Sequence, residues 1–511
     1  MMADQLRPQA LSAYGNAIVD APNLAALGMD GVVFDRAYCN SPICAPSRAS
    51  MMTGLLPSRI GVYDNGAEFP ASVPTLAHKL RARSYRTVLA GKMHFIGPDQ
   101  LHGFEERLTT DVYPAGLDWT PDWTRPLEDR LPWYHDMSSV TDAGSHEATL
   151  QTDYDEEVSF RAVRAIKDLA RSDDGRPFFL LVSFIHPHDP WEVPADSWRR
   201  YEGVEVDPPE VPAIPDARLD PHSRRIRAMC GADHVEISDD AVLNARRAYY
   251  AAVSYLDDRI GEVLAALDAT GLRESTVVMF TADHGEMLGE RGLWYKMAFF
   301  EPSARVPLIV HAPGRFAPRW VPRNVSLIDV MPTVTEMAGD GQPLVPVGQT
   351  DGVSLVPLLR GEDVDTPDVV LGEYLAEGAV APVVMILRGP LKYVHCPDDP
   401  DQLYDLMTDP TELTNLATSP DRADIVTAFR EEVAARWDLE QLGRDVEASQ
   451  RHRRLVQEAL SVGRRTDWDY RPPDGSADRY VRGGDFWGPV AAARLGAAAN
   501  HDGTERHELE R

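Results

Sequence analysis

Several short runs of apolar residues along the chain end in polar residues that are able to carry chemistry. The runs are 178–185, 276–280 and 87–90, and they lead into His188, Asp283 and Lys92 respectively. Apolar runs of about four to eight residues are typical of buried strands in a parallel sheet. Ligands of open α/β sheets bind beyond the carboxyl ends of such strands. We therefore expect the three strand ends to meet at one site.

The segments between these runs have the spacing of amphipathic helices. In one of them, apolar residues recur at steps of three and four: Tyr249, Val253, Leu256, Ile260, Leu264 and Leu267. Strands that alternate with such helices predict the α/β class, with a mostly parallel central sheet covered by helices on both faces. Short strands at 383–387 and 391–394, followed by a helix near 425–437, predict a smaller C-terminal α+β subdomain.

The last part of the chain differs from the rest. From about residue 466 it is polar and rich in Pro and Gly, with interspersed Trp and Tyr. Such a segment is either disordered or an arm that docks on a neighbouring subunit. We therefore expect a catalytic domain at 1–370, a C-terminal subdomain at 371–465 and a tail at 466–511 that serves as an oligomer arm.

Charge and cysteine content narrow the class of protein. The 511 residues include 80 Asp and Glu against 51 Lys and Arg, for a formal net charge of −29. This field repels nucleic acid and anionic membranes, so we expect neither as a partner. Four cysteines in so long a chain make no disulfide framework, and no run reaches the ~18 apolar residues of a membrane span. We expect a cytoplasmic protein without a signal peptide.

The segment 44–54 places Cys44 four residues before Arg48, with a helix expected to start after Pro46. A helix N-terminus and a guanidinium group both attract an anion. A single cysteine is more often a small buried apolar residue, but this segment has the form C-x-P-S-R-x-x-x-M-T-G. It resembles the sulfatase signature at every fixed position. The resemblance implies that a maturation enzyme oxidises Cys44 to formylglycine, and that the hydrated aldehyde is the nucleophile.

A second segment, 84–94, is similar to the sulfatase signature G-Y-x-T-x-x-x-G-K-x-H, with Ser84 in place of the first glycine. Lys92 and His94 alternate along an extended segment, so both can face the site if Met93 points away. A K-x-H triplet alone is usually solvated surface, and the second complete signature favours the functional interpretation. The resemblance implies catalytic roles for Lys92 and His94, and for Arg48 beside the nucleophile.

Carboxylates at two distant points of the chain are candidates for a metal site. Hard divalent cations prefer oxygen ligands from carboxylates and amides. An isolated D-H-G is more often a turn, but the run 283–296 closely follows the sulfatase pattern and ends in Lys296, a second sulfate-binding lysine by resemblance. The resemblance implies one divalent cation, either Ca²⁺ or Mg²⁺, with Mn²⁺ as a further alternative. Its expected ligands are Asp4, Gln5, Cys44, Asp283 and His284.

The string 186–190, H-P-H-D-P, matches the P-H-x-P motif of sulfatases. The resemblance implies that His188 protonates the leaving alcohol. His186 is interpreted as a core histidine with its hydrogen bonds satisfied, with an orienting role as the alternative. For the whole chain, the resemblance implies an alkaline-phosphatase-like three-layer sandwich.

Longer strings at 57–65, 97–107 and 133–135 resemble choline sulfatases in particular. This implies hydrolysis of choline-O-sulfate, a small-molecule sulfate ester, by a homo-oligomer, a dimer or tetramer whose C-terminal arms reach neighbouring sites. A quaternary ammonium group is bound by aromatic faces and carboxylates. The residues expected to contact it are Asn65, Trp133, Asp136 and Glu377. Asp136 stands where the subfamily has Asn.

The N-terminus departs from the sulfatase pattern, because nearly all of the apolar strand expected before Asp4 is absent. Such a strand would be central and buried, so its loss would leave backbone and apolar surface without partners. We expect that the start site is assigned too late. The alternative is a true truncation with a weakened sheet and a loosely held pair, Asp4 and Gln5.

Two other functions remain open. The first is an arylsulfatase, or a phosphonate or phosphate diesterase, on the same scaffold. The second is a non-catalytic relative that keeps the fold, which the full set of catalytic residues argues against.

Overall fold

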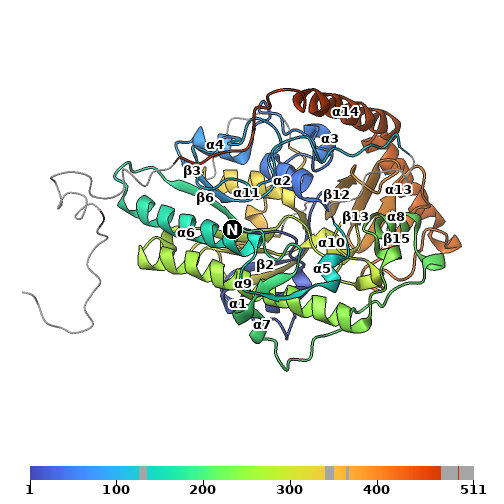
Figure 1. Cartoon of the computed structure of the whole chain (residues 1–511), viewed down its shortest axis with the longest axis horizontal. Coiled ribbons are helices and arrows are strands. Elements are labelled where there is room, and N and C mark those ends of the chain that lie inside the picture. The colour runs from blue at the N-terminus through green and yellow to red at the C-terminus, as the bar shows by residue number, and fades with distance from the viewer. Residues whose placement is uncertain (126–134, 340–349, 364–367, 474–492, 494–511) are drawn as a thin grey trace, which may run out of the picture.

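A large mixed sheet forms the centre of the molecule (Figure 1). The computed structural model describes residues 1–125, 135–339, 350–363, 368–473 and 493. Within them, the strand order is β11-β2-β10-β8-β1-β6-β3-β4, and β9 pairs with β2. The strands are β1 (Met2–Ala3), β2 (Val32–Tyr38), β3 (Arg86–Gly91), β4 (Glu106–Arg107), β6 (Phe178–Ser183), β8 (Val278–Ala282), β9 (Arg305–Val306), β10 (Leu308–His311) and β11 (Arg319–Ser326). Neighbours pair in parallel, except that β10 and β9 run antiparallel to their partners.

Helices cover both faces of this sheet, as the buried strands require. In Figure 1, one group lies below the sheet: α1 (Pro22–Met29), α6 (Leu150–Arg171) and α9 (Asp239–Ala269). The other group lies above it: α2 (Cys44–Thr53), α4 (Leu76–Arg81) and α11 (Val330–Met337). The shorter elements around them are α3 (Pro57–Ile60), α5 (Ser138–Thr141), α7 (Ala195–Arg199), α8 (Pro221–Met229), α10 (Glu301–Ala304), α12 (Val356–Arg360), and the pair β5 (Gly144–His146) and β7 (Glu192–Pro194).

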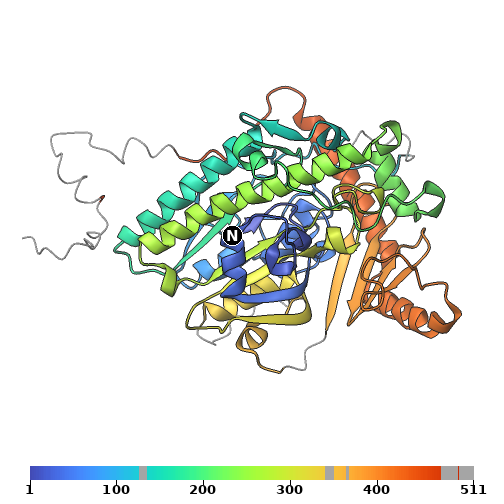
Figure 2. The same ribbon diagram turned by 90° about the horizontal axis from the view of Figure 1, so that it is seen from below.

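A second, antiparallel sheet follows at one side of the molecule (Figure 2). It consists of β12 (Val369–Tyr374), β13 (Val383–Arg388), β14 (Leu391–His395) and β15 (Gln402–Asp405). Helix α13 (Ala423–Arg436) packs its Val426, Phe429 and Val433 against this sheet in a separate apolar cluster. Helix α14 (Leu439–Leu460) then returns to the main sheet's side of the molecule, where Arg453 forms an ion pair with Asp64.

A buried ion cluster ties the small sheet to the main one. Lys392 of β14 has a fully buried side chain, and its Nζ donates to Glu301 Oε1 at 2.6 Å, to Glu412 Oε1 at 2.8 Å and to the Phe299 carbonyl at 2.9 Å. We call Lys392, Glu301 and Glu412 the Lys392 cluster. The two parts therefore share a charged contact that unfolding of either would break.

The predicted fold class is confirmed, down to particular strands. The run 178–185 contains β6, the runs 276–280 and 87–90 overlap β8 and β3, and the predicted amphipathic helix lies in α9. None of the helices in the described residues combines the length and apolar character needed to cross a membrane. The division near residue 370 stays a prediction, and most of the predicted tail lies outside the described residues.

Candidate active site

The site is built around the first turn of α2, which begins at Cys44 and is buried throughout. Asn65 accepts a hydrogen bond from the Ala45 amide at 2.9 Å, which satisfies one of the free N–H groups at the helix start. Ser47 Oγ donates to the Asp283 carbonyl at 2.6 Å and so ties α2 to the end of β8. These bonds place Cys44 at the carboxyl edge of the sheet. The helix begins at Cys44 itself, earlier than the start after Pro46 that the sequence predicts.

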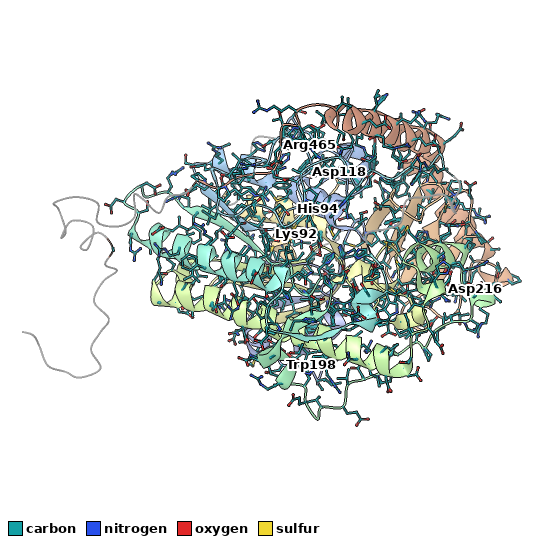
Figure 3. The ribbon with its side chains drawn as sticks, in the orientation of Figure 1. Lys92, His94, Asp118, Trp198, Asp216 and Arg465 are labelled. Atoms are coloured by element: carbon teal, nitrogen blue, oxygen red, sulfur yellow. The ribbon has the colours of Figure 1, made fainter. Side chains whose placement is uncertain are left out.

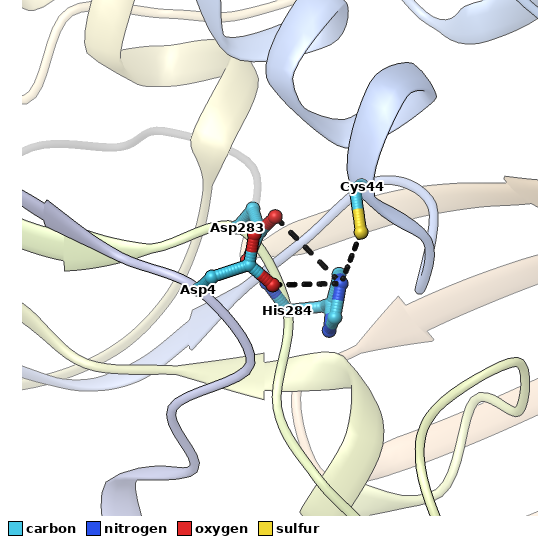
Figure 4. Close-up of side chains that lie close together, drawn as sticks. All are labelled: Asp4, Cys44, Asp283 and His284. Atoms are coloured by element: carbon cyan, nitrogen blue, oxygen red, sulfur yellow. Dashed lines mark hydrogen bonds and ion pairs between the residues drawn. The ribbon is translucent and has the colours of Figure 1, made fainter. Parts of the chain in front are cut away.

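Four side chains converge at this point: Asp4 after β1, Cys44 on α2, and Asp283 and His284 after β8 (Figure 4). One potential ligand atom from each lies within 4.8 Å of the others, and all four residues are buried. His284 Nε2 lies 3.3 Å from Cys44 Sγ, 3.7 Å from an Asp283 oxygen and 4.0 Å from an Asp4 oxygen.

This set fits a divalent cation. Asp4 Oδ1 is buried and has no hydrogen-bond partner among the described residues, which is costly unless a cation or polar group meets it. Two carboxylates and an imidazole around a common point are donors that such a cation accepts. Gln5 lies next to this set, but its side-chain amide donates to Asp189 and Glu286 and its oxygen accepts from Lys296. Its role as a ligand stays a prediction.

Asp4 and Gln5 are firmly held, contrary to the loose pair expected of a truncated chain. Both residues have no exposed surface. Asp4 Oδ2 accepts from Arg48 Nη2 at 2.8 Å and pairs with Lys92, and the Gln5 amide donates to Asp283 Oδ1 at 3.1 Å. Burial alone would raise the pKa of Asp4, but Lys92 and the neighbouring His188 and Arg48 hold it well below the usual value.

Three cationic side chains, Arg48, Lys92 and Lys296, contact the residues around the cluster. Arg48 is fully buried; its Nε donates to Asp283 at 2.8 Å and its Nη1 to the Lys92 carbonyl at 2.6 Å. Lys92 Nζ lies 3.8 Å from Cys44 Sγ. Burial works against the charged form of Lys296, yet Cys44 and the nearby carboxylates raise its pKa. The three side chains give the site a positive field suited to an anionic ester.

The backbone explains two positions of the second signature. A Cβ on Gly91 would lie 1.9 Å from the Ser183 carbonyl oxygen, so the close contact of β3 with β6 requires glycine there. Ser84 has φ of 64°, a conformation that favours glycine, which is the residue it replaces. His94 also has a positive φ, 54°, and its amide and that of Met93 donate to Asp111 at 2.9 Å. Lys92 and His94 lie close together in the interior (Figure 3).

His188 contacts both a cation and a carboxylate of the site. Its Nε2 is 2.8 Å from Lys296 Nζ and 3.9 Å from Asp4 Oδ1, and its Nδ1 donates to the Asp189 carbonyl at 2.6 Å. Burial, and then Lys296, lower the pKa of His188 well below its usual value. By contrast, His186 is a buried histidine that bonds Asp155 through Nδ1 at 2.7 Å and packs on Tyr255. Its Nε2 has no hydrogen-bond partner among the described residues, so its hydrogen bonds are satisfied only in part.

The residues predicted to bind the quaternary ammonium group lie in different settings. Asn65 is buried beside Cys44. Glu377 is also buried, and neither carboxylate oxygen has a hydrogen-bond partner among the described residues; burial, and then Asp64, raise its pKa well above the usual value. Asp136 is exposed and accepts from the Ser138 amide at 2.8 Å. Trp133 lies outside the described residues.

Sequence reasoning missed three residues of the site. Asp189 accepts from Gln5 at 3.0 Å and pairs with His135 at 2.8 Å, and so connects two segments around His188. The Tyr113 ring lies 4.1 Å from Lys92 Nζ and covers it. His135 and Asp189 lie within strings that carry the resemblance, and this adjacency could have indicated them. Tyr113 has no such signal in the sequence.

Comparisons with known proteins agree with this geometry. The family model described as Sulfatase matches residues 1–340, the model described as N-sulphoglucosamine sulphohydrolase, C-terminal matches 289–438, and that described as Choline sulfatase enzyme C terminal matches 444–491. The chain is 48% identical to a choline-sulfatase of Rhizobium meliloti over 489 residues, 94% of each chain. It is 28% identical to an arylsulfatase of Clostridium perfringens over 84% of this chain and 92% of that one.

Among solved structures, the phosphonate monoester hydrolase of Agrobacterium radiobacter is similar. The two chains are 27% identical, the TM-score is 0.68, and the match covers 85% of this chain and 94% of that one. The shared architecture is therefore found in enzymes that cleave different esters.

Proposed function

Because the chain belongs to the sulfatase family and is a sulfuric ester hydrolase, we propose that its substrate is choline-O-sulfate, hydrolysed to choline and sulfate. The observation that carries this proposal is the 48% identity to a choline-sulfatase over 94% of both chains. The match of 444–491 to a choline sulfatase C-terminal model supports it. The buried Glu377 carboxyl has no hydrogen-bond partner among the described residues, and a quaternary ammonium group beside it would offset the raised pKa and favour the carboxylate.

The nucleophile and the metal are part of the same proposal. Formylglycine made from Cys44 would supply the attacking hydroxyl, and a divalent cation held by Asp4, Asp283, His284 and the residue at 44 would polarise the sulfate oxygens. Arg48 bridges Asp4 and Asp283, because it donates to both carboxylates.

The two lysines bind and orient the sulfate group. Lys92 pairs with Asp4 and Lys296 donates to Gln5, the next residue, so an anion that reaches both lysines would be held by two positive charges. Tyr113 covers Lys92 and excludes water from that side. Charge that builds up on the sulfate oxygens is thus stabilised by groups already in position.

Two histidines, His188 and His94, transfer the protons. His188 Nδ1 is bonded to the Asp189 carbonyl, so Nε2 is the nitrogen that faces the site and can hand a proton to the leaving alcohol. A bound sulfate ester raises the proton affinity of His188, because its negative charge offsets that of Lys296. His94 is buried beside Cys44, and burial lowers its pKa, so it is neutral and able to accept a proton.

The proposal includes cytoplasmic location, a maturation enzyme and a homo-oligomer, supported by the cysteine usage and by the choline sulfatase match of the C-terminal segment. A phosphonate or aryl ester as the preferred substrate is the second candidate. The similarity to the Agrobacterium phosphonate monoester hydrolase favours it.

Turnover of choline-O-sulfate, an aryl sulfate and an aryl phosphonate should be compared on protein co-expressed with a formylglycine-generating enzyme. We expect the highest kcat/KM for choline-O-sulfate. The Glu377→Gln variant should lose more activity on choline-O-sulfate than on the aryl sulfate. Glu431→Gln, which changes an exposed glutamate of α13, serves as the matched control. Equal losses on both esters, or a preference of the wild type for an aryl ester, would reject choline-O-sulfate as the substrate.

A further inference from the structure

The segment that carries Lys296 has an unusual backbone. Four of its residues other than glycine have a positive φ: Leu288 at 50°, Arg291 at 62°, Tyr295 at 67° and Met297 at 79°. These conformations favour glycine, so such residues keep them only where the surrounding structure holds them. The position of Lys296 therefore depends on contacts that hold this segment in place.

Glu286 closes the segment at its base. The side chain is fully buried, and its Oε1 accepts from the amides of Leu288 and Tyr295, both at 2.7 Å. A single oxygen thus joins the start of the segment to the residue before Lys296. Burial raises the pKa of Glu286 to about 7, and the ionised and neutral forms both keep an acceptor oxygen for these two amides.

The second oxygen of Glu286 orients Gln5. Glu286 Oε2 accepts from Gln5 Nε2 at 2.5 Å, and Asp189 Oδ1 accepts from the same nitrogen at 3.0 Å. Gln5 Oε1 then accepts from Lys296 Nζ. The opposite orientation of the Gln5 amide would place its oxygen against two carboxyl groups and its NH₂ against an ammonium group. Glu286 and Asp189 therefore decide that Lys296 meets an acceptor.

We propose that Glu286 is a positioning residue for Lys296. One of its oxygens fixes the backbone at Tyr295, and the other fixes the Gln5 amide that receives the ammonium group. The charges of nearby carboxylates, Asp4 among them, also act on Lys296, so an ammonium group without this acceptor has other partners to turn to. The inference rests on the proposed role of Lys296 in binding sulfate, and it assigns Glu286 no contact with the substrate.

Glu286→Gln tests this role with little change of shape. Three N–H donors lie on the two oxygens of Glu286, so a glutamine in either orientation sets its NH₂ against a donor. The measurement is the affinity of the holoenzyme for inorganic sulfate, the reaction product, by titration calorimetry. We expect Glu286→Gln to weaken sulfate binding about tenfold and Lys296→Met to weaken it about 10–100-fold.

The double variant separates positioning from general damage. Because Glu286 acts through Lys296, Glu286→Gln should weaken sulfate binding no further in a protein that already carries Lys296→Met. Losses that multiply in the double variant would overturn the proposal. Unchanged sulfate binding in Glu286→Gln, with the expected loss in Lys296→Met, would overturn this inference alone. Unchanged binding in Lys296→Met would overturn both the inference and the proposed role of Lys296.

Glu290→Gln is the matched control, because it changes a second buried glutamate of the same segment. Glu290 Oε2 accepts from the Val211 amide at 2.8 Å and Oε1 lies 3.4 Å from Arg246, away from Gln5. It should change sulfate affinity by less than about twofold, and a loss as large as that of Glu286→Gln would overturn the proposal.

Glu286→Asp is a conservative second variant, since it keeps two acceptor oxygens on a shorter side chain. We expect its sulfate affinity to lie between those of the wild type and Glu286→Gln. Weaker binding by Glu286→Asp than by Glu286→Gln would overturn the proposal. All proteins are compared at a temperature at which circular dichroism shows them folded.

Discussion

Arg453 of α14 and Asp64 form a bidentate ion pair between parts of the chain that are far apart in sequence. Arg453 Nη1 and Nη2 each donate to an Asp64 oxygen at 2.7 Å, and the Asp64 side chain is fully buried. We predict that Arg453→Met lowers the free energy of unfolding by about 3–5 kcal/mol, because it leaves a carboxylate buried without its partner. Asp64→Asn should cost a similar amount for the converse reason.

The pair also supports the active site. Asp64 fixes the turn that carries Asn65, which accepts from the Ala45 amide next to Cys44. Displacement of this turn should lower kcat by about tenfold or more, since small errors in position are costly at a reacting centre. The matched control is Arg451→Met on the same helix, whose partner Glu447 is solvent-exposed; it should cost less than about 1 kcal/mol.

Urea unfolding of the two single variants, the double variant and the control gives the coupling energy directly. We expect the double variant to be at least about 2 kcal/mol more stable than the sum of the single losses predicts. Additive losses, or an Arg453→Met variant as stable as Arg451→Met, would refute the role assigned to the pair. Loss of stability without loss of kcat would refute the link to Asn65.

Three further predictions follow from buried groups. Lys392→Met leaves the two carboxylates of the Lys392 cluster buried without their cation, so it should lower the free energy of unfolding, measured in urea, by about 3–5 kcal/mol. The control Arg388→Met removes a partly exposed pair and should cost less than about 1 kcal/mol. Similar losses in the two variants would contradict this prediction. His188→Asn should lower kcat for choline-O-sulfate by about 10²–10⁴-fold. It should lower kcat for a nitrophenyl sulfate much less, because a nitrophenolate leaves without a proton. Equal losses on the two esters would contradict the role of His188 as the general acid. Burial raises the pKa of Asp329 to about 7, so the folded chain holds a proton that the unfolded chain releases near pH 4. The free energy of unfolding should therefore fall as pH rises from about 4 to 7, by at most about 4 kcal/mol, and Asp329→Asn should flatten this slope in urea titrations at several pH values; an unchanged slope would contradict the assignment.

Local pattern was enough to predict much of the site. The strands before Asp283 and Lys92 are continuous apolar runs, and their ends meet as a parallel sheet requires. The sequence around Pro46 predicts a helix, but that helix begins at Cys44, before the start expected after Pro46. Such features depend on neighbours within a few residues, and sequence periodicity reports on them directly.

Contacts between distant segments could not be predicted in this way. Asp189 bonds both His135 and Gln5, and Arg453 meets Asp64, yet no spacing rule connects these positions. The side-chain direction of Gln5 is a further case, since its amide turns to Asp189 and Glu286 and its oxygen to Lys296. These interactions depend on how the sheet and helices pack, which the chain specifies only as a whole.

The most direct test of the account is turnover of choline-O-sulfate as a function of the fraction of Cys44 converted to formylglycine. Protein produced with increasing amounts of maturation enzyme gives a series, and the mass of the Cys44 peptide gives the converted fraction. We predict that kcat rises in proportion to this fraction and is absent in Cys44→Ala. Turnover that is independent of conversion, or that persists in Cys44→Ala, would contradict the central claim.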